Sequence, residues 1–387
     1  MRKIIFAALL AVAAPAPAAA QSFLGYRSLG YPVLASGGRT VGTGNLGIGL
    51  AGPQLSASDP AAAAQLFLPT ISLTMQPTWG SFEIGEESGT SNTTRFPLVA
   101  IGFPFPRANG VATVSLAGYM EQRWAGERTG TVELAGRQVL VADTFETNGG
   151  ASVARLGWAQ RVGSRVSVGV SAGAYVGRLE QFFNRSLDSL AVATGVEPFF
   201  EDRRWSYGGY NLAAGVSADP HELLHLAGTV EWSSRITESP RPGTEGETSY
   251  SVPLRLSAGA TARLTPRLSM NGSVVYQDWS GATGYEEGSV SSLALSYGGG
   301  MEWTVLQRET RSLPLRVGYR RIAPPFRYRD HDPVESIWSL GLGINFVELA
   351  GNRFGWMDLA IERGSRTSHP LTERFWRATV SLGISRS

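Results

Sequence analysis

Cysteine is absent from this 387-residue sequence, so no disulfide can stabilise it. Long apolar runs are absent as well. After the first 20 residues, no segment has the roughly 18 uninterrupted apolar residues that a transmembrane helix needs. Such a chain can reside in a membrane only if apolar and polar residues alternate along strands. A closed sheet with every backbone group paired would also replace the stability that disulfides give many exported proteins.

An excess of charge of one sign is also lacking. Arg2 and Lys3 account for the small excess of the 34 basic over the 32 acidic residues, and the rest of the chain is formally neutral. The sequence therefore lacks the basic surface that binds nucleic acid, and we predict no nucleic-acid partner. Glycine is abundant at 47 residues, with 10 tryptophans and 12 tyrosines. Glycine and aromatic residues in a chain of strands suit a β-barrel with aromatic girdles.

The first 20 residues have the order of a secretory signal peptide. Arg2 and Lys3 give a positive start, residues 4–14 are apolar, and residues 18–20 form a small-residue cleavage site before Gln21. The segment is short and interrupted by proline, which disfavours a permanent membrane anchor. We therefore expect cleavage of this signal peptide, export, and a location in the bacterial outer membrane.

A period of two recurs along the rest of the chain, which is the pattern of strands with unlike faces. In residues 166–176, valine and alanine occupy the even positions, whereas serine, glycine and Tyr175 occupy the odd ones. Residues 376–385 alternate in the same way. A soluble β-sandwich also alternates, but its strands have about five or six residues, against about nine to eleven in a strand that crosses a bilayer. The runs here are long, which favours a barrel.

Fourteen strand-like runs are predicted. They cover residues 69–84, 93–105, 110–124, 148–162, 165–178, 205–218, 224–236, 250–263, 267–280, 292–305, 312–322, 336–347, 355–363 and 374–385. Short connections alternate with longer polar ones, such as 85–92, 125–147, 179–204 and 364–373. Outer-membrane barrels have short periplasmic turns and long outer loops. We predict an all-β fold, a transmembrane antiparallel β-barrel of about 14 strands at residues 69–387, preceded by an N-terminal segment at residues 21–68.

Two short motifs match catalytic or nucleotide-binding signatures by chance. His221, Glu222 and His225 match H-E-x-x-H, in which a helix brings both imidazoles to one zinc ion. Here a strand ends just before the motif and the next begins near Leu224, which leaves no room for that helix. Residues 42–47 match G-x-G-x-x-G, but no strand precedes them and no helix follows. We therefore predict no metal site, no cofactor and no catalytic residues.

Four segments carry a resemblance to one family. Residues 39–51 form an Ala- and Gly-rich stretch, and residues 58–62 read Ser-Asp-Pro-Ala-Ala. Residues 252–280 contain a hairpin with a late tryptophan, and residues 313–320 contain Pro-Leu-Arg-Val-Gly-Tyr. In this order they resemble the FadL/TodX-like outer-membrane transport family, which includes PorV-like relatives. Asp59 departs from the family's usual Asn, and the C-terminus lacks the terminal aromatic residue that usually ends such barrels.

The resemblance implies a 14-stranded barrel with residues 21–68 as a plug inside it. It also implies passive uptake of hydrophobic compounds of the long-chain fatty acid or aromatic type, and no enzyme activity. Lipopolysaccharide resists such solutes, whereas an apolar pocket beneath a plug could bind one and release it sideways. Asp59, Pro60 and Ala61 of the plug and the inward-facing Tyr175 are the candidate ligand-binding or gating residues.

PorV-like relatives leave a second hypothesis open. The chain would then be an outer-membrane assembly or secretion partner that binds other proteins through outer loops such as 125–147 and 179–204. A general porin and an enzyme rank behind these two hypotheses. The expected partners are outer-membrane lipid, lipopolysaccharide and a hydrophobic small molecule, together with a secretion-system protein if the second hypothesis holds.

Overall fold

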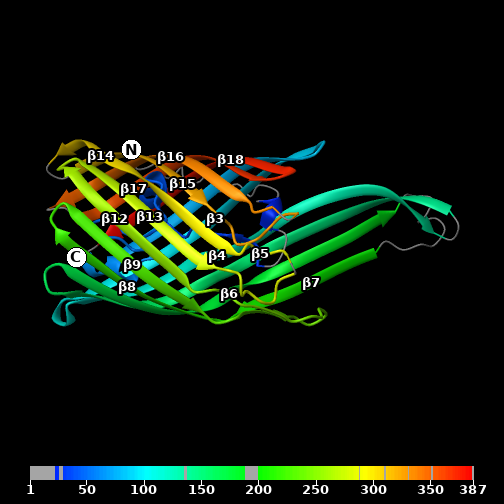
Figure 1. The fold of residues 1–387 in the computed structure, drawn as a ribbon, viewed down its shortest axis with the longest axis horizontal. Helices are drawn as coiled ribbons and strands as arrows, with labels where there is room; N and C mark the ends of the chain where they lie inside the picture. Colours follow the sequence, from blue (N-terminus) through cyan, green and yellow to red (C-terminus); the bar gives the residue numbers. More distant parts are fainter. Residues whose placement is uncertain are drawn as a thin grey trace, which may run out of the picture.

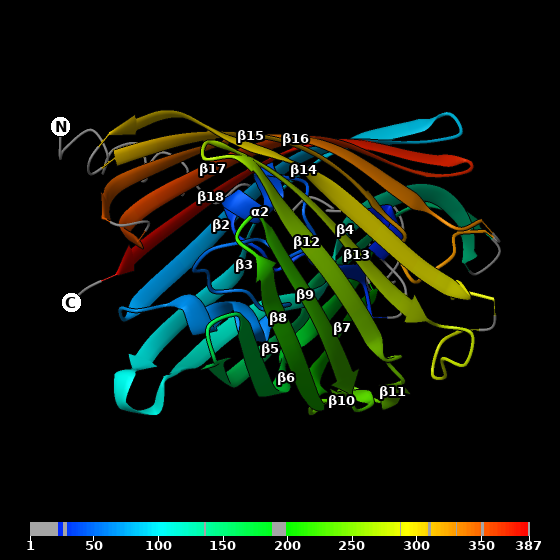
Figure 2. The same cartoon turned by 60° about the vertical axis from the view of Figure 1, so that its left-hand side comes forward.

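The computed structural model describes residues 22–25, 29–134, 137–187, 199–286, 288–308, 311–329, 331–349 and 352–385. The predicted signal peptide lies outside these residues. The described chain forms an antiparallel sheet that closes on itself (Figures 1 and 2). The ring closes where β18 (Leu371–Ser385) pairs with β2 (Thr70–Ile84), at the two ends of the predicted barrel. The predicted all-β antiparallel barrel is confirmed.

The barrel has 14 strand positions, and at three of them a break divides the strand in two. They are β2, β3 (Glu87–Phe105), β4 (Gly110–Leu134), β5 (Arg137–Val162), β6 (Val166–Leu187), β7 with β8 (Phe199–Gly208 and Tyr210–His221), β9 with β10 (Leu224–Ser233 and Ile236–Pro240), β11 with β12 (Thr248–Tyr250 and Arg255–Thr265), β13 (Leu268–Asp278), β14 (Leu293–Arg308), β15 (Arg311–Ile322), β16 (Val334–Leu349), β17 (Asn352–Ser368) and β18. Among the described residues, no helix has the length and apolar character needed to cross a bilayer.

The strands place apolar side chains outside and polar side chains inside. On β18, Trp376 and Ile384 are exposed on the outer face, whereas Arg377, Thr379 and Ser381 are buried inside. The alternation that predicted this strand is therefore confirmed, and β6 repeats it. A soluble protein buries its apolar face, so this inverted arrangement requires an apolar surrounding such as lipid.

Several strands are longer than the sequence predicts. Residues 125–147, predicted as a loop, continue β4 and β5 almost to the turn between them, and residues 87–92 belong to β3. The prediction of long loops was wrong here because polar residues such as Glu127, Arg128 and Asp143 interrupt the apolar alternation while the backbone ladder continues. The extended parts of β4 to β7 project beyond the ring as an arm (Figure 1).

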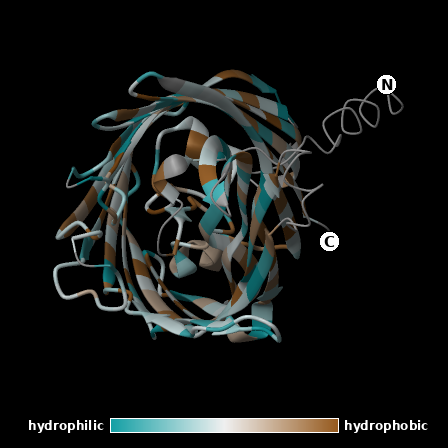
Figure 3. Cartoon of the chain, turned by 90° about the vertical axis from the view of Figure 1, so that its right-hand side faces the viewer, coloured by the Kyte–Doolittle hydropathy of each residue, from teal (hydrophilic) through white to brown (hydrophobic). Residues whose placement is uncertain are grey.

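Residues 29–68, called here the lumen segment, lie inside the ring of strands (Figure 3). The segment contains β1 (Tyr31–Pro32), the short helix α2 (Gly38–Gly42) and the 3₁₀ helix η2 (Pro60–Gln65). Helix α2 contacts β15 to β18, and η2 contacts β5, β6 and β8. Two further 3₁₀ helices, η1 (Phe23–Gly25) and η3 (Pro106–Ala108), lie outside this segment.

Glycines allow the lumen segment to lie directly against the wall. Gly44 has a φ of +64°, and its backbone packs against Gly318 of β15, where a Cβ atom would lie 2.2 Å from the Gly44 nitrogen. Gly49 meets Gly259 of β12 in the same way. The G-x-G-x-x-G match at residues 42–47 therefore reflects close backbone packing.

Buried ion pairs line the inner face of β14 to β18. Arg316 contacts Glu302 at 2.6 Å and Asp358 at 2.7 Å, and Arg39 of the lumen segment contacts Glu302 at 2.9 Å. Further buried pairs are Arg320–Glu362, Arg366–Glu335 and Arg366–Glu373. Each buried guanidinium has a carboxylate partner, as a charge removed from water requires.

The outward apolar face predicts a depth-dependent cost of introducing charge. Val274 lies at the centre of β13 on the outer face, and Leu264 lies at the end of β12 beside a turn. We expect Val274→Arg to lower the free energy of unfolding in lipid by about 2–4 kcal/mol, and Leu264→Arg by about 0–1 kcal/mol. Guanidinium titration of the refolded barrel measures both. Equal losses at the two positions would contradict a wall immersed in lipid.

Candidate functional site

The start of η2, where Asp59, Pro60 and Ala61 lie, anchors the lumen segment on the wall. The Asp59 carboxylate accepts a hydrogen bond from the Ala62 N–H at 3.2 Å and caps η2, and burial raises the pKa of this carboxyl group. Pro60 packs on Gly169 of β6, where a Cβ atom would lie 2.4 Å from the proline backbone. None of the three is among the residues that line the cavity described below. Their role in gating stays a prediction.

Tyr175 lies inside the barrel on β6 and is buried. Its hydroxyl shares a 2.7 Å hydrogen bond with Ser233, and its ring meets Tyr119 edge-on with 5.0 Å between centroids. Tyr119 lines the cavity and Tyr175 supports it from behind. A direct role of Tyr175 in ligand binding stays a prediction.

The H-E-x-x-H residues lie at a hairpin turn. His221 ends β8 and β9 begins at Leu224, so only two residues separate the strands. The register pairs His221 with Leu224, which places His225 on the opposite face. His225 points inward and its Nδ1 lies 2.8 Å from Asp219. The two imidazoles therefore do not face one point, and the described residues contain no group of three candidate metal ligands.

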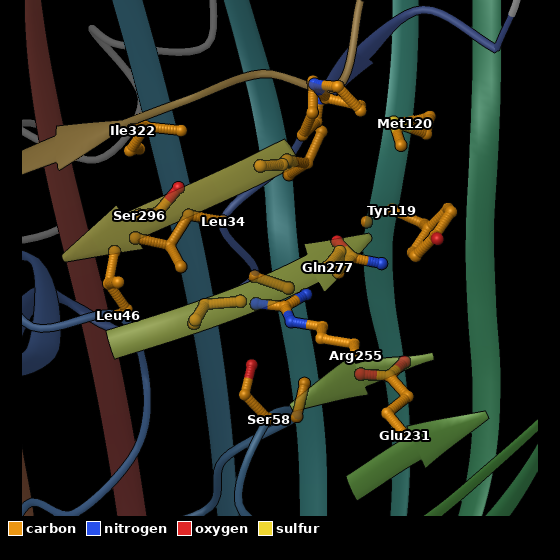
Figure 4. Close-up of a pocket in the computed structure, with 18 of the residues that line it drawn as sticks. Leu34, Leu46, Ser58, Tyr119, Met120, Glu231, Arg255, Gln277, Ser296 and Ile322 are labelled. Atoms are coloured by element: carbon orange, nitrogen blue, oxygen red, sulfur yellow. The ribbon is translucent and has the colours of Figure 1, made fainter. Parts of the chain in front are cut away.

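A cavity lies between the lumen segment and the wall (Figure 4). It has a volume of about 110 Å³. Leu34 and Leu46 of the lumen segment face Met120, Val275 and Ile322 from the wall. The apolar lining suits a hydrophobic body, but the volume is smaller than the roughly 150 Å³ of a cavity that holds benzene. A longer ligand would have to extend beyond this cavity.

One end of the cavity carries charged side chains. Arg155 of β5 donates to Glu231 of β9 at 2.6 Å and to Asn211 at 2.8 Å, and it lies 3.3 Å from the Ala57 carbonyl of the lumen segment. Arg255, the first residue of β12, reaches into the cavity from the strand beside Glu231 (Figure 4). A small polar set in an apolar cavity is the usual arrangement for orienting an amphipathic ligand.

The wall is interrupted beside this cavity. The ladder between β3 and β4 runs from Phe105–Gly110 only as far as Leu98–Ala117. Beyond that point β3 pairs with β2 alone, and β4 pairs with β5 and with the two residues of β1. A hollow of about 540 Å³ lies at this gap, between Phe96 and Pro97 on one side and β4 to β6 on the other.

Bulges on both bordering strands explain why the ladder stops. On β3, Phe96 and Pro97 together oppose the single residue Met75, because Thr74 pairs with Leu98 and Gln76 with Arg95. On β4, Tyr119 is the extra residue. A bulge bends a strand and changes the face of the residues after it, and Pro97 has no N–H for the ladder.

The cavity and the side hollow meet at a neck. Val33, Gly118 and Met120 line both. Val33 donates a backbone hydrogen bond to the Tyr119 carbonyl at 2.9 Å, and its side chain rests on Gly118, where a Cβ atom would lie 2.9 Å from it. The neck is therefore closed by one residue of the lumen segment against a glycine of the wall.

The cavity and the gap were not predicted from the sequence. A bulge adds a single residue to one strand, so it leaves only a local phase shift in the alternation, which boundary uncertainty hides. Pro97 was the available signal, since proline within a strand marks an edge or a bulge. The cavity charges Arg155, Glu231 and Arg255 occupy inward positions of predicted strands and had no motif to mark them.

Comparisons with known proteins support the fold. No family model and no curated protein sequence matches the chain. Among solved structures, it is similar to the toluene transporter TbuX of Ralstonia pickettii, with 10% identity, a TM-score of 0.60, and coverage of 91% of this chain and 98% of that one. A Pseudomonas aeruginosa FadL homologue gives 14% identity, a TM-score of 0.59, and coverage of 92% and 99%.

The Pseudomonas putida toluene transporter TodX gives 12% identity, a TM-score of 0.57, and coverage of 91% and 98%. The similarity extends over nearly the whole of each chain. The chain therefore has the fold of the FadL- and TodX-type barrels, as the resemblance in its sequence implied.

Proposed function

We propose that the chain is an outer-membrane channel for passive uptake of hydrophobic compounds, with residues 21–68 as its plug. One observation carries the proposal: an apolar cavity beneath the lumen segment adjoins a gap in the barrel wall. A solute released through that gap would pass from the cavity into the lipid around the barrel without crossing the polar lumen. The neighbours with this fold include proteins named as toluene transporters, which supports the same class of function.

The lumen contents support a channel that is selective rather than a general porin. The backbone of the lumen segment packs directly on wall glycines, and buried ion pairs occupy the inner face of β14 to β18. Both features reduce the space for water-filled passage. Transfer of a hydrophobic solute from water into an apolar cavity of this kind is, in contrast, favourable.

The proposal predicts that uptake depends on the neck. We expect Gly118→Phe to place a ring where the Val33 side chain lies, to obstruct the neck, and so to lower uptake of a radiolabelled hydrophobic compound severalfold. Gly130→Phe is the matched control, because Gly130 lies farther along β4 in open space. Uptake is measured in host cells that lack their own transporter and express each variant. Unchanged uptake in Gly118→Phe cells would refute the side route.

The plug proposal has a separate test. Gly318→Leu puts a side chain where the Gly44 backbone lies, so we expect the lumen segment to be displaced and the barrel to leak. Sensitivity of the host to a large hydrophilic antibiotic should rise severalfold. Gly272→Leu, on the outer face of β13 with open space around it, should leave sensitivity unchanged. A sealed Gly318→Leu barrel would argue against a plugging role.

The arm favours a second candidate function, that of an assembly or secretion partner. It extends β4 to β7 beyond the ring and carries aromatic pairs, among them Phe145–Phe183 and Phe182–Phe200, each with 4.8 Å between centroids. Phe199 and Phe200 are exposed at its edge. If this function holds, Phe199→Ser with Phe200→Ser should abolish association with other outer-membrane proteins in cross-linking while uptake of hydrophobic compounds stays normal. Loss of uptake alone would favour the channel.

A further inference from the structure

Exposed arginines gather at the end of the barrel where the short turns lie, opposite the arm (Figure 1). They flank the turns β3–β4, β5–β6, β12–β13 and β14–β15. The set is called here the turn rim, and its members are Arg107, Arg161, Arg165, Arg263, Arg267, Arg308 and Arg311. The β8–β9 turn differs from these four, because it carries Asp219 and Glu222.

Three of the turns have an arginine on each side. In the β5–β6 and β12–β13 turns, the residues between the two arginines include no acidic residue. Arg308 and Arg311 are direct cross-strand partners at the ends of β14 and β15. Like charges that face each other across a ladder repel, and an arginine cannot relieve the repulsion by losing its proton. Each pair of arginines is therefore a place where a bound anion would lower the electrostatic energy.

The protein supplies few counter-charges at this end. In the part of the chain that the structure describes, none of the turn-rim arginines has a carboxylate within ion-pair distance. Arg165 and Arg263 donate only to backbone carbonyls, those of Pro220 and Glu222, each at 3.3 Å. The described residues of the turns thus combine seven arginines with two carboxylates, although the whole chain has a formal charge of only +2.

The opposite end of the barrel is built differently. There, exposed arginines lie beside carboxylates, as in the pairs Arg203–Glu201 at 2.5 Å, Arg204–Asp202 at 2.6 Å and Arg374–Glu83 at 3.2 Å. Pairs of this kind need no anion from outside the protein. The excess of positive charge is therefore a property of the short-turn end and not of the surface in general.

The turn rim lies where the apolar outer face ends. Val162, Leu264 and Leu306 stand next to its arginines in the sequence or within two residues of them, and their exposed fractions are 54%, 53% and 46%. Farther along β14, Trp303 is also exposed on the outer face, and tryptophan marks the boundary between hydrocarbon and headgroups. An arginine at this depth can lay its apolar stem on the wall and extend its guanidinium among the headgroups.

We propose that the turn rim binds the phosphate groups of anionic phospholipids, such as phosphatidylglycerol, in the leaflet at the short-turn end. The guanidinium fork matches two phosphate oxygens, and a basic cluster beside an anionic bilayer surface is attracted to it. A soluble acidic partner would leave the adjoining apolar side chains without lipid. The inference requires only that the barrel lies in a membrane, so it holds whichever solute passes through the channel.

The test compares two lipids that differ only in the headgroup. The purified full-length barrel in a neutral detergent is mixed with equal amounts of phosphatidylglycerol and phosphatidylcholine that have identical acyl chains. Native mass spectrometry then measures the ratio of the two lipids that stay bound. We expect a ratio of at least about five in favour of phosphatidylglycerol, since one basic residue near an anionic lipid surface is worth about that factor.

Variants assign the preference to the turn rim. Arg161→Gln with Arg165→Gln should lower the ratio about twofold or more, and so should Arg308→Gln with Arg311→Gln. The two changes combined should lower it further. The matched control is Arg128→Gln with Arg241→Gln, which removes the same charge from exposed residues at the opposite end, Arg128 on the arm and Arg241 just after β10. Its ratio should equal that of the natural chain.

The remaining outcomes would overturn the inference. A ratio of about one for the natural chain means that the rim does not select anionic lipid. An equal decrease in the control variant means that net charge alone sets the ratio. Displacement of phosphatidylglycerol by millimolar glycerol 3-phosphate would assign the rim to a soluble phosphate. Heat-dependent gel mobility confirms that each variant is folded, and the uptake of hydrophobic compounds is measured separately, so failure of the proposed channel function would be recognised independently.

Discussion

Backbone pairing is the constraint on which the rest of this structure depends. A strand surrounded by lipid has no water to satisfy its N–H and C=O groups, so its neighbours must pair with it along its whole length. The ring satisfies this requirement by joining β18 to β2. An interruption of the ladder is therefore expensive, and the gap between β3 and β4 is partly compensated. Arg123 donates to the Thr94 carbonyl at 3.3 Å, and β1 of the lumen segment pairs with β4 from inside. The compensation therefore comes from a side chain of β4 and from the lumen segment, and not from the β3–β4 ladder itself.

The lumen obeys a second constraint, because it must be filled by polar groups that satisfy one another. Ion pairs and close backbone packing on wall glycines achieve this along β14 to β18, where the lumen segment lies directly on the wall. Near β4, β5 and β12 the filling is incomplete, and the cavity lies there, with Arg255 beside the Arg155–Glu231 ion pair.

The sequence predicted the barrel more completely than the site. Alternation has a period of two wherever lipid lies on one side and the lumen on the other, so runs such as residues 376–385 were identified with their faces correctly assigned. The same signal vanished in residues 125–147, where polar residues interrupt the alternation, and a loop was predicted instead of a strand. Asp59 and Pro60 were chosen from a resemblance, and the structure gives them an anchoring position. Tyr119 and Val33 were missed because their placement depends on a bulge and on the path of the lumen segment, which no local pattern encodes. Arg255 was missed because no motif marks it among the inward positions of its strand.

Low identity with the similar structures follows from the same physics. The outer face requires only apolar side chains, and the inner face requires only polar groups that pair, so very different sequences build the same ring. The 10–14% identity to the toluene transporters and the FadL homologue is enough for a shared fold. The chemistry of a solute, in contrast, depends on a few cavity side chains that such identity does not preserve. For this chain, the side chains that line the cavity are therefore a better guide to the chemistry of a solute than the names of the proteins that share its fold.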